Sequence, residues 1–189
     1  MRTLKKLSKG AFEHWQPFRV HGELVNGRSW CYRVIEIAIP GAGELKVKHL
    51  ILDLNGTIAL DGIIIEGVKE RLDRLSLLLD IFIVTSDTMR SAERVTGNLN
   101  VRLRKLKESD GGIQKLEFIR KLGERETISI GNGSNDVLML RESLIGIGIL
   151  GREGASVDAV MASDVIVSDV NDALDLLLKP DRLAATLRK

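Results

Sequence analysis

The stretch His49-Leu50-Ile51-Leu52-Asp53-Leu54-Asn55-Gly56-Thr57 decides the fold. A short apolar run ends in an aspartate, and an Asn-Gly-Thr turn follows. Apolar runs of this length, bounded by turn residues, are typical of strands that are buried on both faces of a parallel sheet. In open sheets of that kind, ligands bind just beyond the carboxyl ends of the strands. Asp53 is therefore a candidate nucleophile or metal ligand, although a strand-end Asp also serves as a helix cap or turn former.

Two further apolar runs end in polar clusters. Residues 81–84 lead into Thr85-Ser86-Asp87, and residues 127–130 lead into Gly131-Asn132-Gly133-Ser134-Asn135-Asp136. Because the carboxyl ends of parallel strands meet at one edge of a sheet, the three clusters are expected to converge.

Helical and strand patterns alternate along the rest of the chain. Helices are expected over residues 67–80, from Gly111-Gly112 to Leu122, after Asp136, over residues 155–162 and 170–178, and after Pro180. Further strands are expected over residues 144–150 and 164–167, and small hairpins over residues 34–48 and 58–65. This alternation predicts an α/β fold, a three-layer Rossmann-like parallel sheet with helices on both faces and a small N-terminal β-hairpin.

The first 33 residues differ in composition from the rest. The net charge is +2, but residues 1–33 hold seven Lys/Arg and two Asp/Glu, together with five of the seven aromatic residues. Such a segment can form a nucleic-acid arm, since cations and stacking rings are what these arms use. We prefer a basic, aromatic-containing extension, disordered or loosely docked, ahead of one domain over residues 34–189.

Composition also bounds the cellular setting. The single Cys31 excludes an internal disulfide and argues against a Cys-based zinc site. No stretch approaches the roughly 18–20 apolar residues of a membrane span, and the first 16 residues lack the apolar run of a signal peptide. We expect a soluble protein of the cytoplasm that binds neither membrane nor nucleic acid.

The three clusters contain the groups that phosphoryl chemistry needs. A strand-end Asp53 facing a second acidic loop at Asp136 could hold Mg²⁺ through one or two carboxylates and several waters. The hydroxyl groups of Thr57 and Thr85 could bind phosphoryl oxygens, and a lysine could neutralise their charge. Lys115 is the candidate lysine, with Lys121 on the same helix as the alternative.

The order of these motifs resembles a known family. An apolar strand, Asp-x-x-Gly-Thr, a second strand ending in Thr, a Lys, and Gly-x-Gly-x-Asn-Asp follow one another as in the haloacid dehalogenase (HAD) superfamily. The nearest branch is the phosphorylation domain of P-type ATPases, and the chain looks most similar to the soluble P-type ATPase-like proteins. The resemblance covers about residues 47–178.

The resemblance implies a role for each matching residue. It makes Asp53 the nucleophile that forms an aspartyl-phosphate in a Mg²⁺-dependent phosphohydrolase. The other implied roles are the catalytic position (Asn55), phosphate binding and neutralisation (Thr57, Thr85, Ser86, Lys115), and metal binding (Asp53, the backbone carbonyl of Asn55, Asn132 and Asp136). Ser86 and Asp87 also have a reading as caps of the next helix.

Two positions depart from the family's pattern. Most hydrolytic members have an acid/base Asp at position 55, and P-type ATPases have Thr, whereas this chain has Asn, whose amide cannot exchange a proton near neutral pH. Asn132 likewise stands where the family's metal-ligand Asp is expected. We therefore predict weak Mg²⁺ affinity and slow turnover, with a long-lived phospho-aspartate. The alternative is a non-catalytic regulatory or phosphate-binding protein with the same fold.

No cap domain fits between the motifs. Only 27 residues separate Thr57 from Thr85, and 29 separate Thr85 from Lys115, and the predicted elements fill both gaps. Only the hairpin over residues 58–65 could cover the site. An open, capless site predicts a macromolecular substrate, loose selectivity, or a lid formed by a second copy or a partner protein. The phosphorylated substrate itself stays unidentified.

Overall fold

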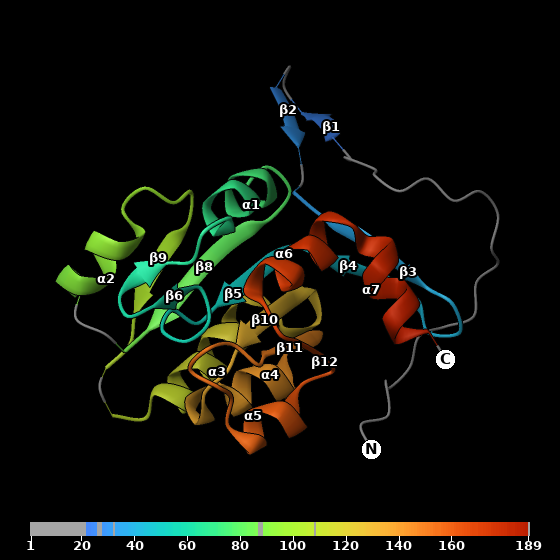
Figure 1. Ribbon diagram of the computed structural model, residues 1–189. Helices are drawn as coiled ribbons and strands as arrows, with labels where there is room; N and C mark the ends of the chain where they lie inside the picture. The colour runs from blue at the N-terminus through green and yellow to red at the C-terminus, as the bar shows by residue number, and fades with distance from the viewer. Residues whose placement is uncertain (1–21, 26–27, 32, 87–88, 108, 189) are drawn as a thin grey trace.

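The computed structural model describes residues 22–25, 28–31, 33–86, 89–107 and 109–188. The core of the molecule is a sheet of six parallel strands in the order β12-β11-β10-β5-β8-β9 (Figure 1). In that order the strands are Val165–Val167, Ile145–Ile149, Thr127–Gly131, His49–Leu52, Asp80–Thr85 and Arg102–Lys105. The predicted α/β fold is confirmed.

Side chains that alternate along the strands separate the core into two layers. Leu50 and Leu52 of β5 face α1 (Val68–Leu75) and α6 (Val170–Leu178). Ile51, between them, faces the opposite layer, which holds α3 (Gly111–Leu122), α4 (Val137–Glu142) and α5 (Val157–Ala162). Figure 1 shows the two groups of helices on opposite faces of the sheet. The sheet is covered on both faces because its central strands are apolar on both.

Helix α2 (Met89–Thr96) lies between β8 and the edge strand β9 in the chain. Short 3₁₀ helices at Glu124–Glu126 and Ser134–Asp136 precede β10 and α4. Among the described residues, no helix is long and apolar enough to cross a membrane.

Hairpins flank the sheet, as the patterning predicted for two of them. Strands β3 (Ile35–Ile39) and β4 (Gly43–Val47) pair antiparallel and bury their apolar side chains, and α7 (Pro180–Leu187) packs against β3. Strands β6 (Ala59–Leu60) and β7 (Ile63–Ile64) are joined by Asp61-Gly62. Both turn residues have positive φ (52° and 74°), as a tight two-residue hairpin requires.

A third hairpin was not predicted. Strands β1 (Gly22–Val25) and β2 (Arg28–Cys31) pair antiparallel, within the segment for which we expected no regular structure. Asn26-Gly27, a dipeptide that favours hairpin turns, stands between them in the sequence. The absence of a sustained apolar alternation concealed this signal. The expectations for residues 1–21 lie outside the described residues.

Candidate active site

Asp53 lies where the sequence predicted it, directly beyond β5. Its backbone N–H donates to the carbonyl of Ile130 at 3.0 Å, which extends the pairing of β5 with β10 by one residue. The Asp53 residue is only 7% exposed. The neighbouring strands therefore fix the direction of a largely buried carboxylate at the edge of the sheet.

Of the two candidate lysines, Lys115 is the one that lies beside Asp53. Its ammonium nitrogen lies 2.5 Å from Asp53 Oδ1 and 2.5 Å from Asp136 Oδ1, and its side chain is fully buried. Helix α3 begins at Gly111, so Lys115 lies one turn into the helix and faces the strand ends. Lys121, the alternative on the same helix, is exposed.

Burial and charge shift the proton affinities of this ion-paired group. Burial, followed by repulsion from Asp136, raises the pKa of Asp53 to about 6, although the Lys115 ammonium opposes the shift. Burial lowers the pKa of Lys115, but the two carboxylates outweigh it, so the pKa of Lys115 is raised. Above about pH 6 the site therefore holds an ionised Asp53 beside a protonated Lys115.

The loop after β10 is fixed by side chains at both of its ends. Asp136 Oδ2 accepts hydrogen bonds from the backbone N–H groups of Asn132 (3.0 Å) and Gly133 (2.9 Å). The Asn132 side chain accepts at Oδ1 from the Thr57 hydroxyl (3.2 Å) and donates from Nδ2 to the carbonyl of Gly154 (3.0 Å). The structure thus joins three predicted site residues, Thr57, Asn132 and Asp136, in one hydrogen-bonded network.

The remaining predicted residues lie around this network. Thr85 is buried at the end of β8, the strand next to β5. Ser86 is half-buried, and its hydroxyl lies beside Gly111 at the start of α3. Asn55 is exposed in the turn after Asp53, and it forms an isolated bridge with Ala59. The alternative reading of Ser86 and Asp87 as helix caps involves residues 87 and 88, which lie outside the described residues.

The site has enough oxygen ligands for Mg²⁺, but only a few of them. Within the described part of the chain, no three His, Cys, Asp or Glu side chains form a group that could hold a metal. Both oxygens of Asp136 already accept hydrogen bonds. The remaining donors are the Asp53 carboxylate, the Asn132 amide oxygen and the Asn55 carbonyl. This set fits Mg²⁺, since the ion often takes only one or two carboxylates and keeps several waters.

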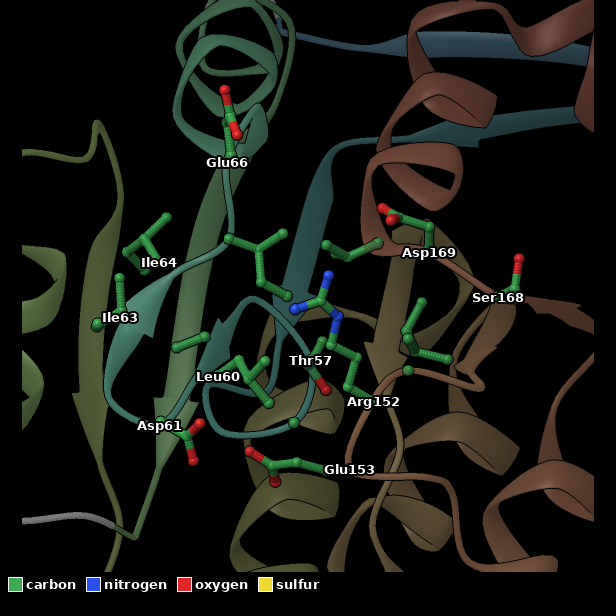
Figure 2. A pocket seen from close by; sticks show the side chains of 16 residues that line it. Thr57, Leu60, Asp61, Ile63, Ile64, Glu66, Arg152, Glu153, Ser168 and Asp169 are labelled. Carbon is green, nitrogen blue, oxygen red and sulfur yellow. The ribbon is translucent and has the colours of Figure 1, made fainter.

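A cavity of about 420 Å³ opens beside Gly56 and Thr57 (Figure 2). The β6–β7 hairpin forms one wall of this cavity. This is the hairpin that, by the sequence analysis, could cover the site. The start of α6 and the loop after β11 form the other walls. Sequence analysis missed two charged residues of that loop, Arg152 and Glu153. Arg152 and Glu153 lie between two glycines, as in an ordinary polar turn. No signal in the sequence distinguishes this loop from such a turn.

Comparisons with known proteins agree with this architecture. No protein-family model matches the chain. An uncharacterized protein of Methanocaldococcus jannaschii is 45% identical over 80 residues, which make up 40% of this chain and 86% of that protein. Phospholipid-transporting ATPase ID of Homo sapiens is 42% identical over 65 residues, 34% of this chain but only 5% of the ATPase.

Solved structures show the same fold at low identity. The 3-deoxy-D-manno-octulosonate 8-phosphate phosphatase of Moraxella catarrhalis, in complex with magnesium, phosphate and a sugar acid, superposes with a TM-score of 0.55. The match has 19% identity and covers 75% of this chain and 94% of the phosphatase. At this identity the likeness is one of fold.

The fold is that of HAD superfamily hydrolases among the solved structures, so the resemblance that the motifs predicted is confirmed at the level of the fold. The chain belongs to the same family as the uncharacterized Methanocaldococcus jannaschii protein. Its similarity to phospholipid-transporting ATPases agrees with the predicted resemblance to P-type ATPases.

Proposed function

We propose that the chain is a Mg²⁺-dependent phosphohydrolase that forms an aspartyl-phosphate on Asp53 and turns over slowly. The observation that carries this proposal is the buried Lys115 ammonium, 2.5 Å from both the Asp53 and Asp136 carboxylates. A buried cation beside a strand-end carboxylate is suited to a site where a phosphoryl group adds negative charge.

The first step transfers the phosphoryl group to the protein. A carboxylate oxygen of Asp53 attacks phosphorus, a new P–O bond forms, and the bond from phosphorus to the leaving alcohol oxygen breaks. Lys115 neutralises the transferred group, and the hydroxyl groups of Thr85 and Ser86 donate to its oxygens. The Thr57 hydroxyl joins them when it turns from Asn132, to which it donates in the structure. Mg²⁺, when bound by Asp53, the Asn55 carbonyl and Asn132, would supply further positive charge to the phosphoryl oxygens.

The second step returns the protein to its starting state. Water attacks the phosphorus of the aspartyl-phosphate, the bond to Asp53 breaks, and inorganic phosphate leaves. Neither step has a proton carrier at position 55, because the Asn55 amide cannot exchange a proton near neutral pH. General acid/base help is typically worth about 10²–10⁴ in rate. Both steps therefore rely on solvent, and the phospho-aspartate is long-lived.

The comparisons support the class of chemistry. A phosphatase with the same fold was crystallised with magnesium and phosphate, and the same fold occurs in a zinc-transporting PIB-type ATPase in the E2.Pi state. We take from these proteins the phosphoryl chemistry and the divalent metal. The substrate of this chain is a phosphorylated compound whose identity they do not determine.

Trapping with beryllofluoride tests the proposal, because this ion mimics a phosphoryl group on a carboxylate. We expect beryllofluoride and Mg²⁺ together to raise the thermal unfolding midpoint, each alone to have little effect, and the Asp53→Ala variant to lose the response. A wild-type protein that does not respond would contradict the proposal.

The amide at position 55 favours one second candidate, a non-catalytic protein that binds phosphate and regulates a partner, because the amide cannot act as an acid or a base. That protein would be stabilised by inorganic phosphate but not by beryllofluoride.

A further inference from the structure

Asn132 stands where an acidic metal ligand is expected, and the carboxylate of Glu153 lies close to it. We propose that Glu153, from the loop after β11, supplies the carboxylate that Asn132 lacks, so that Asp53, Asn132 and Glu153 form the metal end of the site. This inference rests on the proposed Mg²⁺-dependent function and names a residue that the family motifs do not include.

Gly56 shows how close Glu153 lies to the site. Gly56 follows Asn55 and has a φ of 75°. A Cβ atom at this position would lie 2.8 Å from Glu153 Oε2, 2.5 Å from Asn132 Nδ2 and 3.0 Å from Asn132 Oδ1. The carboxylate of Glu153 and the amide of Asn132 therefore lie on the same side of Gly56, the residue that follows the proposed metal ligand Asn55.

Asn132 itself holds the loop that carries Glu153. Its Nδ2 donates to the carbonyl of Gly154 at 3.0 Å, and its own carbonyl accepts from the backbone N–H of Ser156 at 2.9 Å. An ionised Asp at position 132 has no side-chain N–H, so the hydrogen bond to Gly154 would be lost. Its carboxylate would also be repelled by the partial negative charge of the Gly154 carbonyl oxygen. The amide of Asn132 therefore holds in place the loop that carries the Glu153 carboxylate, which an Asp at position 132 would not do.

The charge of Glu153 is available for a cation. Glu153 makes no ion pair with any residue that the structure describes. Figure 2 shows its carboxylate pointing away from the guanidinium of its neighbour Arg152. Asp53, Asp136 and Lys115 together have a formal charge of −1, and Glu153 brings the site to −2. The second negative charge strengthens the attraction of the site for a divalent cation.

Mg²⁺ binding measured by calorimetry, without any substrate, tests the role of Glu153. We expect Glu153→Gln to lower the affinity for Mg²⁺ by about 10–100-fold, the loss typical when a group that supports a metal is removed. Glu66→Gln is the matched control, since Glu66 lines the same cavity just before α1 and loses the same charge (Figure 2). Its Mg²⁺ affinity should equal that of the wild-type protein.

A second variant tests the exchange of carboxylate between the two positions. In Asn132→Asp/Glu153→Gln the acid returns to position 132, and we expect part of the lost affinity to return. Because Glu153 is exposed, Glu153→Gln should keep the wild-type unfolding midpoint in the absence of metal.

The outcomes separate this inference from the proposed function. Wild-type Mg²⁺ affinity in Glu153→Gln, or an equal loss in Glu66→Gln, would overturn the role of Glu153 while beryllofluoride trapping stands. A selective loss of affinity in Glu153→Gln supports that role even if beryllofluoride fails to trap Asp53. A wild-type chain that binds no Mg²⁺ would overturn both.

Discussion

Replacing Lys115 by Met should leave two buried carboxylates without their shared cation. Lys115 is fully buried, and Asp53 and Asp136 lie on either side of its ammonium group at 2.5 Å. Removing one partner of a buried ion pair typically costs about 3–5 kcal/mol, because the remaining charge stays buried without compensation. We expect Lys115→Met to lower the free energy of unfolding by that amount at pH 8.

The loss should depend on pH in a stated direction. The folded-state pKa of Asp53, about 6, lies above its ordinary value of 3.8, so its contribution to stability is full below pH 3.8 and is lost as the pH rises through 6. Without the Lys115 ammonium, which lowers the pKa of Asp53, that pKa rises further and the loss continues above pH 6. The stability difference between wild type and Lys115→Met should therefore be smaller at pH 5 than at pH 8.

Urea unfolding at the two pH values measures this difference. Lys121→Met is the matched control, because Lys121 lies on the same helix but is exposed, and surface substitutions usually stay within about 0.5 kcal/mol. Adding Asp53→Asn to Lys115→Met should recover part of the loss, since it removes one uncompensated charge. If Lys115→Met and Lys121→Met unfold at the same urea concentration at pH 8, Lys115 does not hold the two carboxylates together.

Three further variants or conditions test the site. Because the pKa of Asp53 is about 6, phospho-aspartate formation from an aryl phosphate should rise about tenfold from pH 5 to pH 7, as the nucleophile ionises; a flat profile would contradict this. Asn55→Asp should raise steady-state turnover of the same substrate by about 10²–10⁴, with Asn55→Ala as the control that should not. Gly56→Ala should lower the free energy of unfolding by more than the roughly 1–2 kcal/mol expected from its positive φ alone, because polar side-chain atoms crowd this position. Gly62→Ala should lose only that backbone cost, because Gly62 has a φ of 74° and open space around it. Equal losses of the two variants in urea unfolding would refute the effect of crowding.

The sequence predicted which strand ends form the site, because the signals for buried strands are local. A buried strand shows itself by an apolar run, and parallel strands bring their carboxyl ends together. Those two facts place Asp53, Thr85 and Asp136 at one edge without further information. The helix from Gly111 to Leu122 was predicted with the bounds that the structure has.

The choice between Lys115 and Lys121 could not be made in the same way. Both lie on one helix, and which of them faces the strand ends depends on how α3 rotates against the sheet. That rotation is set by packing, with Ile119 buried in the layer below the sheet. Glu153 was missed for a related reason, since its place beside Gly56 comes from the contact of two distant loops and leaves no periodic pattern.

The two hydrogen bonds of Lys115 also determine which residue the position can hold. An ammonium group has three N–H donors, and the carboxylates of Asp53 and Asp136 take two of them. The third donor can serve a phosphoryl oxygen while the first two bonds stay in place, so phosphorylation need not break the ion-paired group. A guanidinium directs its donors in one plane and needs more room than a fully buried lysine occupies. Position 115 therefore requires Lys itself, and Arg, despite its equal charge, would have to separate the two carboxylates.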